Sequence, residues 1–358
     1  MRKTTKITTL LFLIGTLAFS QDNLKYAETI NIFDLEKHLR ILASDSLEGR
    51  ETGKPGQKMA AAYIANHFKD LGLPAYVETV DPYTKVRRTS YFQKFRVKSK
   101  RHLCKCEDCD VDFIKELLGI KKWIEGENVI GFIEGTDLKD EYIIITAHYD
   151  HLGKHDSLIF NGADDDGSGT VAAMEIAEAF VMAKREGKGP RRSVVIMPVS
   201  GEEKGLLGSK YYTDNPVFPL EKTVANLNID MIGRLDDWHQ EDPNYVYLIG
   251  ADRLSQELHD ISEQVNEKHT QLDLDYRFNE EDDPNRYYYR SDHYNFAKNN
   301  IPVIFYFNGV HEDYHKVTDT IEKIDYYKIQ KITKLIFLTA WELANKDERL
   351  KLNEINAN

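Results

Sequence analysis

Downstream of residue 141, segments rich in β-branched and aliphatic residues alternate with segments of helical periodicity. The β-rich segments are 142–146, 193–199, 223–229, 245–249 and 302–307, and the helical segments are 170–184, 254–268 and 326–345. Two further helices are predicted earlier, over 31–43 and 55–71. Strands separated by helix-length segments form a mostly parallel sheet with helices on both faces. The sequence therefore predicts an α/β fold with three layers, α/β/α, and a mixed, mostly parallel central sheet.

The N-terminal part of the chain departs from this alternation in two places. Residues 1–20 combine a basic start, a short apolar run and a small final residue, which is typical of a secretory signal peptide. Because a membrane span needs about 20 apolar residues, we expect cleavage and export to the periplasm or the extracellular space, without stable membrane association. An uncleaved anchor is the alternative. Residues 21–358 are expected to form one domain, with additional strands and an insertion at about 76–128.

Cysteine content and charge restrict the classes of function. All three cysteines, Cys104, Cys106 and Cys109, lie in that insertion; a local disulfide or a surface loop is favoured over a metal clip, because no fourth ligand is defined. The net charge of −12, from 59 acidic and 47 basic residues, argues against nucleic acid as a partner. A basic stretch at 85–105 is interpreted as a strand with a solvated basic face. The sequence does not indicate an oligomeric state.

Five short motifs of carboxylates and histidines accompany the predicted strands. They occupy residues 147–151, 162–167, 201–203, 228–231 and 313–315, and four of them follow or end a β-rich segment. Because the carboxyl ends of parallel strands meet at one edge of an open α/β sheet, these side chains are expected to gather there. Histidine nitrogen and carboxylate oxygen are ligands that zinc accepts. The pattern is typical of a hydrolase in which two metal ions activate a water molecule.

Three of these motifs indicate chemistry by their residue types. His148 ends a strand, and Asp150 is placed to hold its second ring nitrogen, although a strand-end pair of this kind is more often structural. Three consecutive aspartates at 164–166 indicate either a bound cation or an acidic turn before a helix. Glu202 and Glu203 are adjacent in an extended segment and point in different directions, which suits a general base beside a metal ligand.

Together the motifs resemble those of the co-catalytic zinc aminopeptidase family, which includes bacterial leucyl aminopeptidases and glutamate carboxypeptidase II. The resemblance extends over about residues 42–345 and rests on His148-Tyr-Asp150, Gly162-Ala-Asp-Asp165-Asp, Gly201-Glu-Glu203, Asp230-Met and His315-x-x-x-Asp319-Thr. It implies two Zn²⁺ ions per chain, bridged by Asp165. The other implied ligands are His148 and Asp230 at one site, and Glu203 and His315 at the second. The resemblance, and not the spacing, selects Asp165 among the three aspartates and His315 over His311.

The same resemblance implies which residues act beside the metal ions. Glu202 is the general base, Asp150 orients His148, and Asp319 supports His315. Tyr288 lies where the family often has a donor for the oxyanion, but the choice among the three tyrosines at 287–289 stays open.

The leading hypothesis is an exported zinc-dependent aminopeptidase that hydrolyses N-terminal residues from peptides. A carboxypeptidase and a single-zinc glutaminyl cyclase of the same fold are the alternatives. A non-catalytic binding domain is disfavoured, because every implied metal ligand and the implied base are present. The side-chain preference stays open, because the sequence does not fix the conformation of the loops at 238–244 and 279–289.

Overall fold

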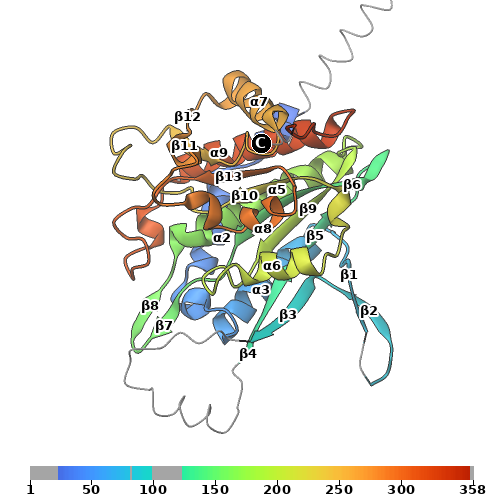
Figure 1. The fold of residues 1–358 in the computed structure, drawn as a ribbon. Coiled ribbons are helices and arrows are strands. Elements are labelled where there is room, and N and C mark those ends of the chain that lie inside the picture. The colour runs from blue at the N-terminus through green and yellow to red at the C-terminus, as the bar shows by residue number, and fades with distance from the viewer. Residues whose placement is uncertain (1–22, 81–82, 99–122, 355–358) are drawn as a thin grey trace, which may run out of the picture.

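The computed structural model describes residues 23–80, 83–98 and 123–354. The predicted signal peptide and the three cysteines lie outside these described residues. Within them, a seven-stranded sheet forms the middle layer of the molecule (Figure 1), in the order β12-β11-β13-β10-β6-β9-β5. Its strands are β5 (Gly131–Ile133), β6 (Leu138–His148), β9 (Arg192–Val199), β10 (Thr223–Ile229), β11 (Tyr245–Ile249), β12 (Asp273–Asp275) and β13 (Val303–Phe307).

The sheet is mixed, with a parallel block at its centre. Strands β13, β10, β6 and β9 are parallel to their neighbours within this block. Strand β5 pairs antiparallel with β9, strand β11 pairs antiparallel with β13, and β12 is parallel to β11. The predicted mixed, mostly parallel sheet is therefore confirmed, and the carboxyl ends of the four central strands lie at the same edge.

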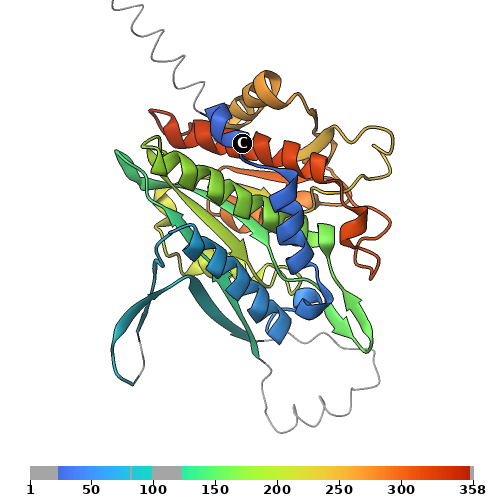
Figure 2. The same cartoon turned by 180° about the vertical axis from the view of Figure 1, so that it is seen from behind.

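Helices cover both faces of the sheet. One face carries α2 (Ile32–Leu42), α3 (Pro55–Asp70), α5 (Gly169–Arg185) and α9 (Tyr326–Asn345), as Figure 2 shows, and α7 (Gln256–Val265) packs against α9. The opposite face carries α6 (Leu207–Asp214) and α8 (His293–Ala297), as Figure 1 shows. Successive side chains of β6 alternate between these layers: Ile143 and Ile145 join the larger core with α5 and α9, and Ile144 joins the core below α6 and α8. Burial on both faces explains the run of three isoleucines, Ile143–Ile145, in the second half of this strand.

The sequence predicted several element bounds closely and others less well. Strands β10 and β11 and helix α9 match the predicted ranges, whereas the helix predicted over 254–268 consists of α7 and a short π-helix over Asn266–Thr270. The additional strands expected near 76–128 are β1 (Val77–Val80), β2 (Arg87–Ser90), β3 (Phe92–Lys98) and β4 (Trp123–Val129), which form two antiparallel pairs. A further hairpin of β7 (Gly153–His155) and β8 (Leu158–Phe160) was not predicted. Among the described residues, no helix is both long enough and apolar enough to cross a membrane.

Helices α2, α3 and α5 enclose a cluster of titratable side chains away from the motif-bearing edge of the sheet. The ring of His38 lies edge-on to that of His67, and its Nδ1 atom is 2.7 Å from the hydroxyl of Tyr63. Its Nε2 atom is 3.9 Å from a carboxylate oxygen of Glu175, which is 2% exposed. Burial lowers the pKa of His38 to about 4 and raises the pKa of Glu175 to about 8. At pH 6 both groups are therefore neutral.

Replacement of Glu175 by Gln is expected to raise the stability of the protein more at pH 9 than at pH 6. Between the ordinary pKa of 4.5 and the folded-state value of about 8, the folded protein holds a proton that the unfolded chain releases, so stability falls as the pH rises through this range. The variant lacks that loss, so its stability relative to the wild type should rise by roughly 3 kcal/mol between pH 6 and pH 9. Urea unfolding of both proteins at the two pH values, at constant metal content, measures it. A difference independent of pH would show that Glu175 is already ionised at pH 6.

Candidate active site

Four of the five motifs lie where the central strands end. His148 is the last residue of β6, Glu202 and Glu203 follow β9, Asp230 follows β10, and the loop after β13 leads to His315. The fifth motif, residues 163–168, lies directly before α5. Because these strands are parallel neighbours, their motifs converge at one edge of the sheet, as the sequence predicts.

Short contacts connect the five predicted metal ligands, and Asp165 lies in the middle of the group. The Nε2 atom of His148 is 3.2 Å from Asp165 Oδ1 and 3.4 Å from Asp230 Oδ1. On the other side, His315 Nε2 is 3.1 Å from Asp165 Oδ2 and 3.4 Å from Glu203 Oε2. The two oxygens of Asp165 thus face two different sets of partners.

These distances fit the donor set of a tetrahedral zinc ion. Ligand atoms about 2.0 to 2.2 Å from such an ion lie about 3.3 to 3.6 Å from each other. The Oδ2 atom of Asp165 and the Oε1 atom of Glu203 are buried and have no hydrogen-bond partner of good geometry. Since unpaired carboxylate oxygens are costly to bury, a cation between them accounts for the arrangement.

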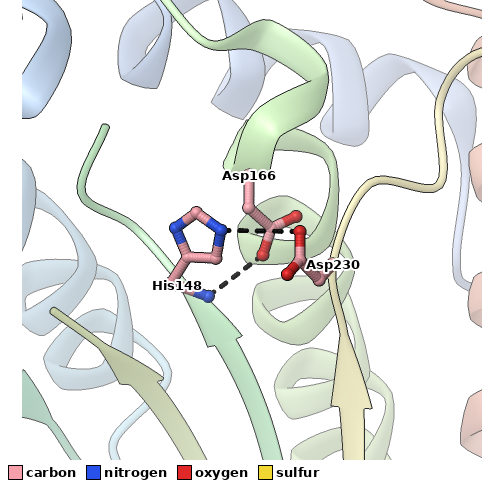
Figure 3. A group of neighbouring side chains, drawn as sticks. All are labelled: His148, Asp166 and Asp230. Carbon is pink, nitrogen blue, oxygen red and sulfur yellow. Dashed lines mark hydrogen bonds and ion pairs between the residues drawn. The ribbon is translucent and has the colours of Figure 1, made fainter. Parts of the chain in front are cut away.

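Asp166 lies beside this group, but its oxygens are already engaged. Figure 3 shows it near His148 and Asp230, and the three residues are close enough to hold an ion. Its carboxylate, however, accepts hydrogen bonds from the backbone N–H groups of His148 at 3.0 Å, Met231 at 3.0 Å and Gly169 at 2.9 Å. Asp166 therefore fixes the positions of three loops, whereas the oxygens of Asp165 face the histidines of the two ligand sets.

His151 is a candidate ligand that the sequence analysis did not select. Its Nδ1 atom is 2.9 Å from Glu203 Oε1 and 3.7 Å from Asp165 Oδ2, and its ring is fully buried. Neither ring nitrogen has a hydrogen-bond partner of good geometry, and His151, Asp165 and Glu203 form a second group that is close enough to hold an ion. The available signal was its place in the same short motif as His148.

The adjacent glutamates have opposite electrostatic environments. Burial raises the pKa of Glu202 well above its usual range; Glu203 and Asp230 reinforce this, while His148 opposes it. For Glu203, burial and Asp165 favour a higher pKa, but His151 and His315 hold its pKa below the usual value. Glu203 is thus held as a carboxylate, while Glu202, which lines the cavity, is able to take up a proton.

Asp150 lies where the sequence predicts, but it contacts the imidazole of His148 through its main chain. The Nδ1 atom of His148 is 3.0 Å from the carbonyl oxygen of Asp150 and 3.9 Å from its carboxylate. That carboxylate accepts hydrogen bonds from the hydroxyl of Thr52 and, at 3.3 Å, from the backbone N–H of Glu202. Asp150 therefore positions both the imidazole and the segment that carries the glutamates.

The structure does not support the expected role of Asp319. Its carboxylate accepts hydrogen bonds from the backbone N–H groups of Asp164 at 3.1 Å and Asp165 at 3.2 Å, instead of contacting His315. Asp319 thus supports the aspartate loop. A support that the sequence analysis missed is Ser291, which donates a 2.6 Å hydrogen bond to Asp230 Oδ2.

Tyr288, the expected oxyanion donor, lies outside the cavity beside the candidate ligands. Its ring packs below the guanidinium of Arg253, whose centre is 4.0 Å from the ring centroid, and against His293. The tyrosines that line the cavity are Tyr287 and Tyr314. Tyr288 is therefore not among the residues that line this cavity, and its role as oxyanion donor stays a prediction.

The fold and this site define a class of protein, the metal-dependent hydrolases of the α/β type, in which two adjoining sets of ligands lie at the carboxyl edge of the sheet. A model of peptidase family M28 matches residues 128–340, and the chain belongs to this family. The resemblance seen in the sequence motifs is therefore confirmed.

A curated relative and several solved structures are similar to this chain. A probable glutamate carboxypeptidase of Arabidopsis thaliana is 38% identical over 105 residues, which cover 29% of this chain but only 14% of the plant protein. The LapA aminopeptidase of Legionella pneumophila has a similar fold, with a TM-score of 0.65, 19% identity and coverage of 92% of this chain and 76% of that chain. A glutaminyl cyclase of Bacteroides thetaiotaomicron is also similar, with a TM-score of 0.61, 14% identity and coverage of 87% and 98%. The fold by itself therefore does not separate a peptidase from a cyclase.

Proposed function

We propose that this chain is an exported zinc-dependent aminopeptidase that hydrolyses N-terminal residues from peptides. The observation that carries the proposal is the position of Asp165, whose two oxygens face two separate ligand sets at 3.1 to 3.2 Å. A carboxylate that faces both ways suits a pair of zinc ions. Membership of a peptidase family supports peptides as the substrates.

The proposed ligands are His148 and Asp230 for one ion, and Glu203 and His315 for the other, with Asp165 between them and His151 adjoining the second set. Two bound zinc ions supply an activated water and polarise the scissile carbonyl. Glu202 accepts the proton of the attacking water and returns it to the departing amine, a role for which a raised pKa is suited.

The second ligand set favours a peptidase over a single-zinc glutaminyl cyclase. In a site for one ion, the buried carboxylate oxygens of Asp165 and Glu203 and the ring nitrogens of His151, which lack hydrogen-bond partners of good geometry, would have no cation to offset their burial. A carboxypeptidase shares the same chemistry and differs in the substrate end that it binds. For export, we expect the mature protein to begin close to residue 21, which mass spectrometry of secreted or periplasmic protein tests.

Chelation is expected to abolish peptide hydrolysis and to lower thermal stability. Without metal, the buried carboxylates of Asp165, Glu203 and Asp230 lose their compensating charge, and the folded state loses the binding free energy of the ions. Elemental analysis, cleavage of a panel of aminoacyl chromogenic substrates and the Tm before and after chelation measure this. About two zinc ions per chain, with chelator-sensitive release, is the expected result.

The same experiment separates the alternatives. One zinc ion per chain with cyclisation of N-terminal glutamine would identify a cyclase instead. Release of C-terminal residues from N-blocked peptides would identify a carboxypeptidase. No bound metal and no turnover would contradict the enzyme proposal altogether.

A further inference from the structure

The cavity beside the candidate ligands has three kinds of wall. One wall is acidic and carries Glu202 and four of the five predicted ligands, all except Glu203, and another wall is apolar and includes Met231, Phe305 and Phe307. The third wall contains Arg290. An arginine in a cavity that is meant to bind an N-terminal ammonium group requires an explanation, because the two cations repel each other.

Arg290 has a defined position but forms no ion pair with any described residue. Its guanidinium lies 5.0 Å from the ring centroid of Tyr287, which restrains the side chain by stacking. Elsewhere in the described chain, Arg234 pairs with Asp313 at 2.8 Å and Arg277 with Asp275 at 2.8 Å. Arg290 is exposed and also forms a hydrogen bond with the hydroxyl of Tyr287. Because a guanidinium carries five N–H donors, the remaining ones are available to a ligand.

The acidic loop of residues 280–283, which precedes Arg290 in the chain, forms no ion pair with it. Asp283, its one buried carboxylate, accepts hydrogen bonds from the backbone N–H groups of Asn285 at 3.0 Å and Tyr287 at 2.9 Å, and it thereby shapes the turn that leads to Arg290. The acidic wall does not require Arg290 either. Two divalent cations would offset the four carboxylates of Asp165, Glu202, Glu203 and Asp230 without it.

We infer that Arg290 binds a carboxylate of the substrate, on the basis of the proposed peptidase function. A planar guanidinium forms paired hydrogen bonds with a carboxylate, which gives both affinity and orientation. The apolar wall contacts an apolar side chain of the substrate, and Arg290 binds the negatively charged group of the neighbouring substrate residue. The preferred substrates are then short peptides that carry a carboxylate one residue from the scissile bond, either the free C-terminus of a dipeptide or an acidic side chain.

The test compares substrates that share a scissile bond and differ by one charge. The metal-loaded wild-type protein, Arg290→Gln and Arg290→Lys are assayed with Leu-Leu and Leu-Leu-amide, and with Leu-Glu-amide and Leu-Gln-amide. If the C-terminal carboxylate is bound, the wild type should prefer Leu-Leu over its amide by roughly 10- to 100-fold in kcat/KM, mostly through KM. Arg290→Gln should bring this ratio close to one, and Arg290→Lys should retain part of it. If an acidic side chain is bound, the wild type should instead prefer Leu-Glu-amide over Leu-Gln-amide, and the two variants should change that ratio in the same way.

Arg286→Gln is the matched control. Arg286 lies in the same loop and stacks on Tyr289, with its guanidinium 4.8 Å from the ring centroid, but it does not line the cavity. Its replacement should leave both ratios unchanged. Equal ratios for the wild type and Arg290→Gln in both pairs, with peptides still hydrolysed, would overturn the inference and leave the proposed function intact. Failure of the wild type to hydrolyse any of the four peptides would overturn the proposed function and the inference with it.

Discussion

Replacement of Glu202 by Gln is expected to lower kcat by about 10²- to 10⁴-fold while the protein retains its metal. The amide has nearly the same shape as the carboxylate but cannot accept the proton of the attacking water. Because Glu202 lines the cavity and its pKa is raised by burial, its carboxylate is the group best suited to take that proton and return it. Steady-state kinetics together with elemental analysis measure the effect.

Glu203→Gln is the matched control for this experiment. The carboxylate of Glu203 is 2.9 Å from His151 and 3.4 Å from His315, within the second ligand set. Its replacement should lower the affinity for metal, with activity partly restored at high zinc concentration, whereas added zinc should not restore Glu202→Gln. Full activity of Glu202→Gln would remove Glu202 from the role of general base.

A second large effect, on stability and on metal binding, is expected when Arg50 is replaced. This residue is 1% exposed and contacts two of the loops that carry candidate ligands. Its guanidinium donates to the carbonyl oxygens of Tyr149 at 2.7 Å and Gly162 at 2.8 Å, and also to those of Leu42 and Asn161, both at 2.6 Å. Tyr149 directly follows His148, and Gly162 opens the aspartate loop. Arg50→Met should destabilise the protein by about 3 kcal/mol or more, because several buried acceptors lose a charged donor. It should also weaken metal binding.

Urea unfolding and zinc titration of three variants test the role of Arg50. Arg50→Lys should be intermediate, because an ammonium group cannot reproduce the geometry of the guanidinium. Arg40→Met is the control, since Arg40 is exposed on α2 and pairs with Glu36 of the same helix, so its loss should change stability by less than about 0.5 kcal/mol. If Arg50→Met unfolded like the wild type and bound zinc with the same affinity, Arg50 would have no part in holding the two loops.

The sequence predicts those parts of the fold whose signal is local. Strand β11 is a short apolar run between Asn244 and Gly250, and α9 begins after Asp325, whose side chain caps the helix at Lys328. The place of each strand in the sheet depends on contacts between distant segments. The antiparallel pairing of β5 with β9, and that of β11 with β13, therefore became visible only in the structure.

The candidate site shows the same division between local and distant signals. The strand ends placed His148 and Asp230 correctly beside Asp165, because the direction of a strand determines where its last residue lies. The partner of Asp319 could not be predicted, because its carboxylate reaches N–H groups of a loop about 150 residues earlier in the chain. The sequence could not decide among the three tyrosines at 287–289, because consecutive residues in a helical turn point in different directions, and in the structure Tyr287 lines the cavity.

The three consecutive aspartates have three different sets of partners. Asp164 accepts a 2.6 Å hydrogen bond from the N–H of Gly233 and lies 3.2 Å from His311, Asp165 faces the cavity, and Asp166 accepts three backbone N–H groups. A mutational scan would therefore find a different set of tolerated substitutions at each of these three positions, although all three carry aspartate. For protein design, grafting this site onto another scaffold would require more than copying the ligands, because the new backbone would also have to present the N–H donors that hold Asp164 and Asp166 in place.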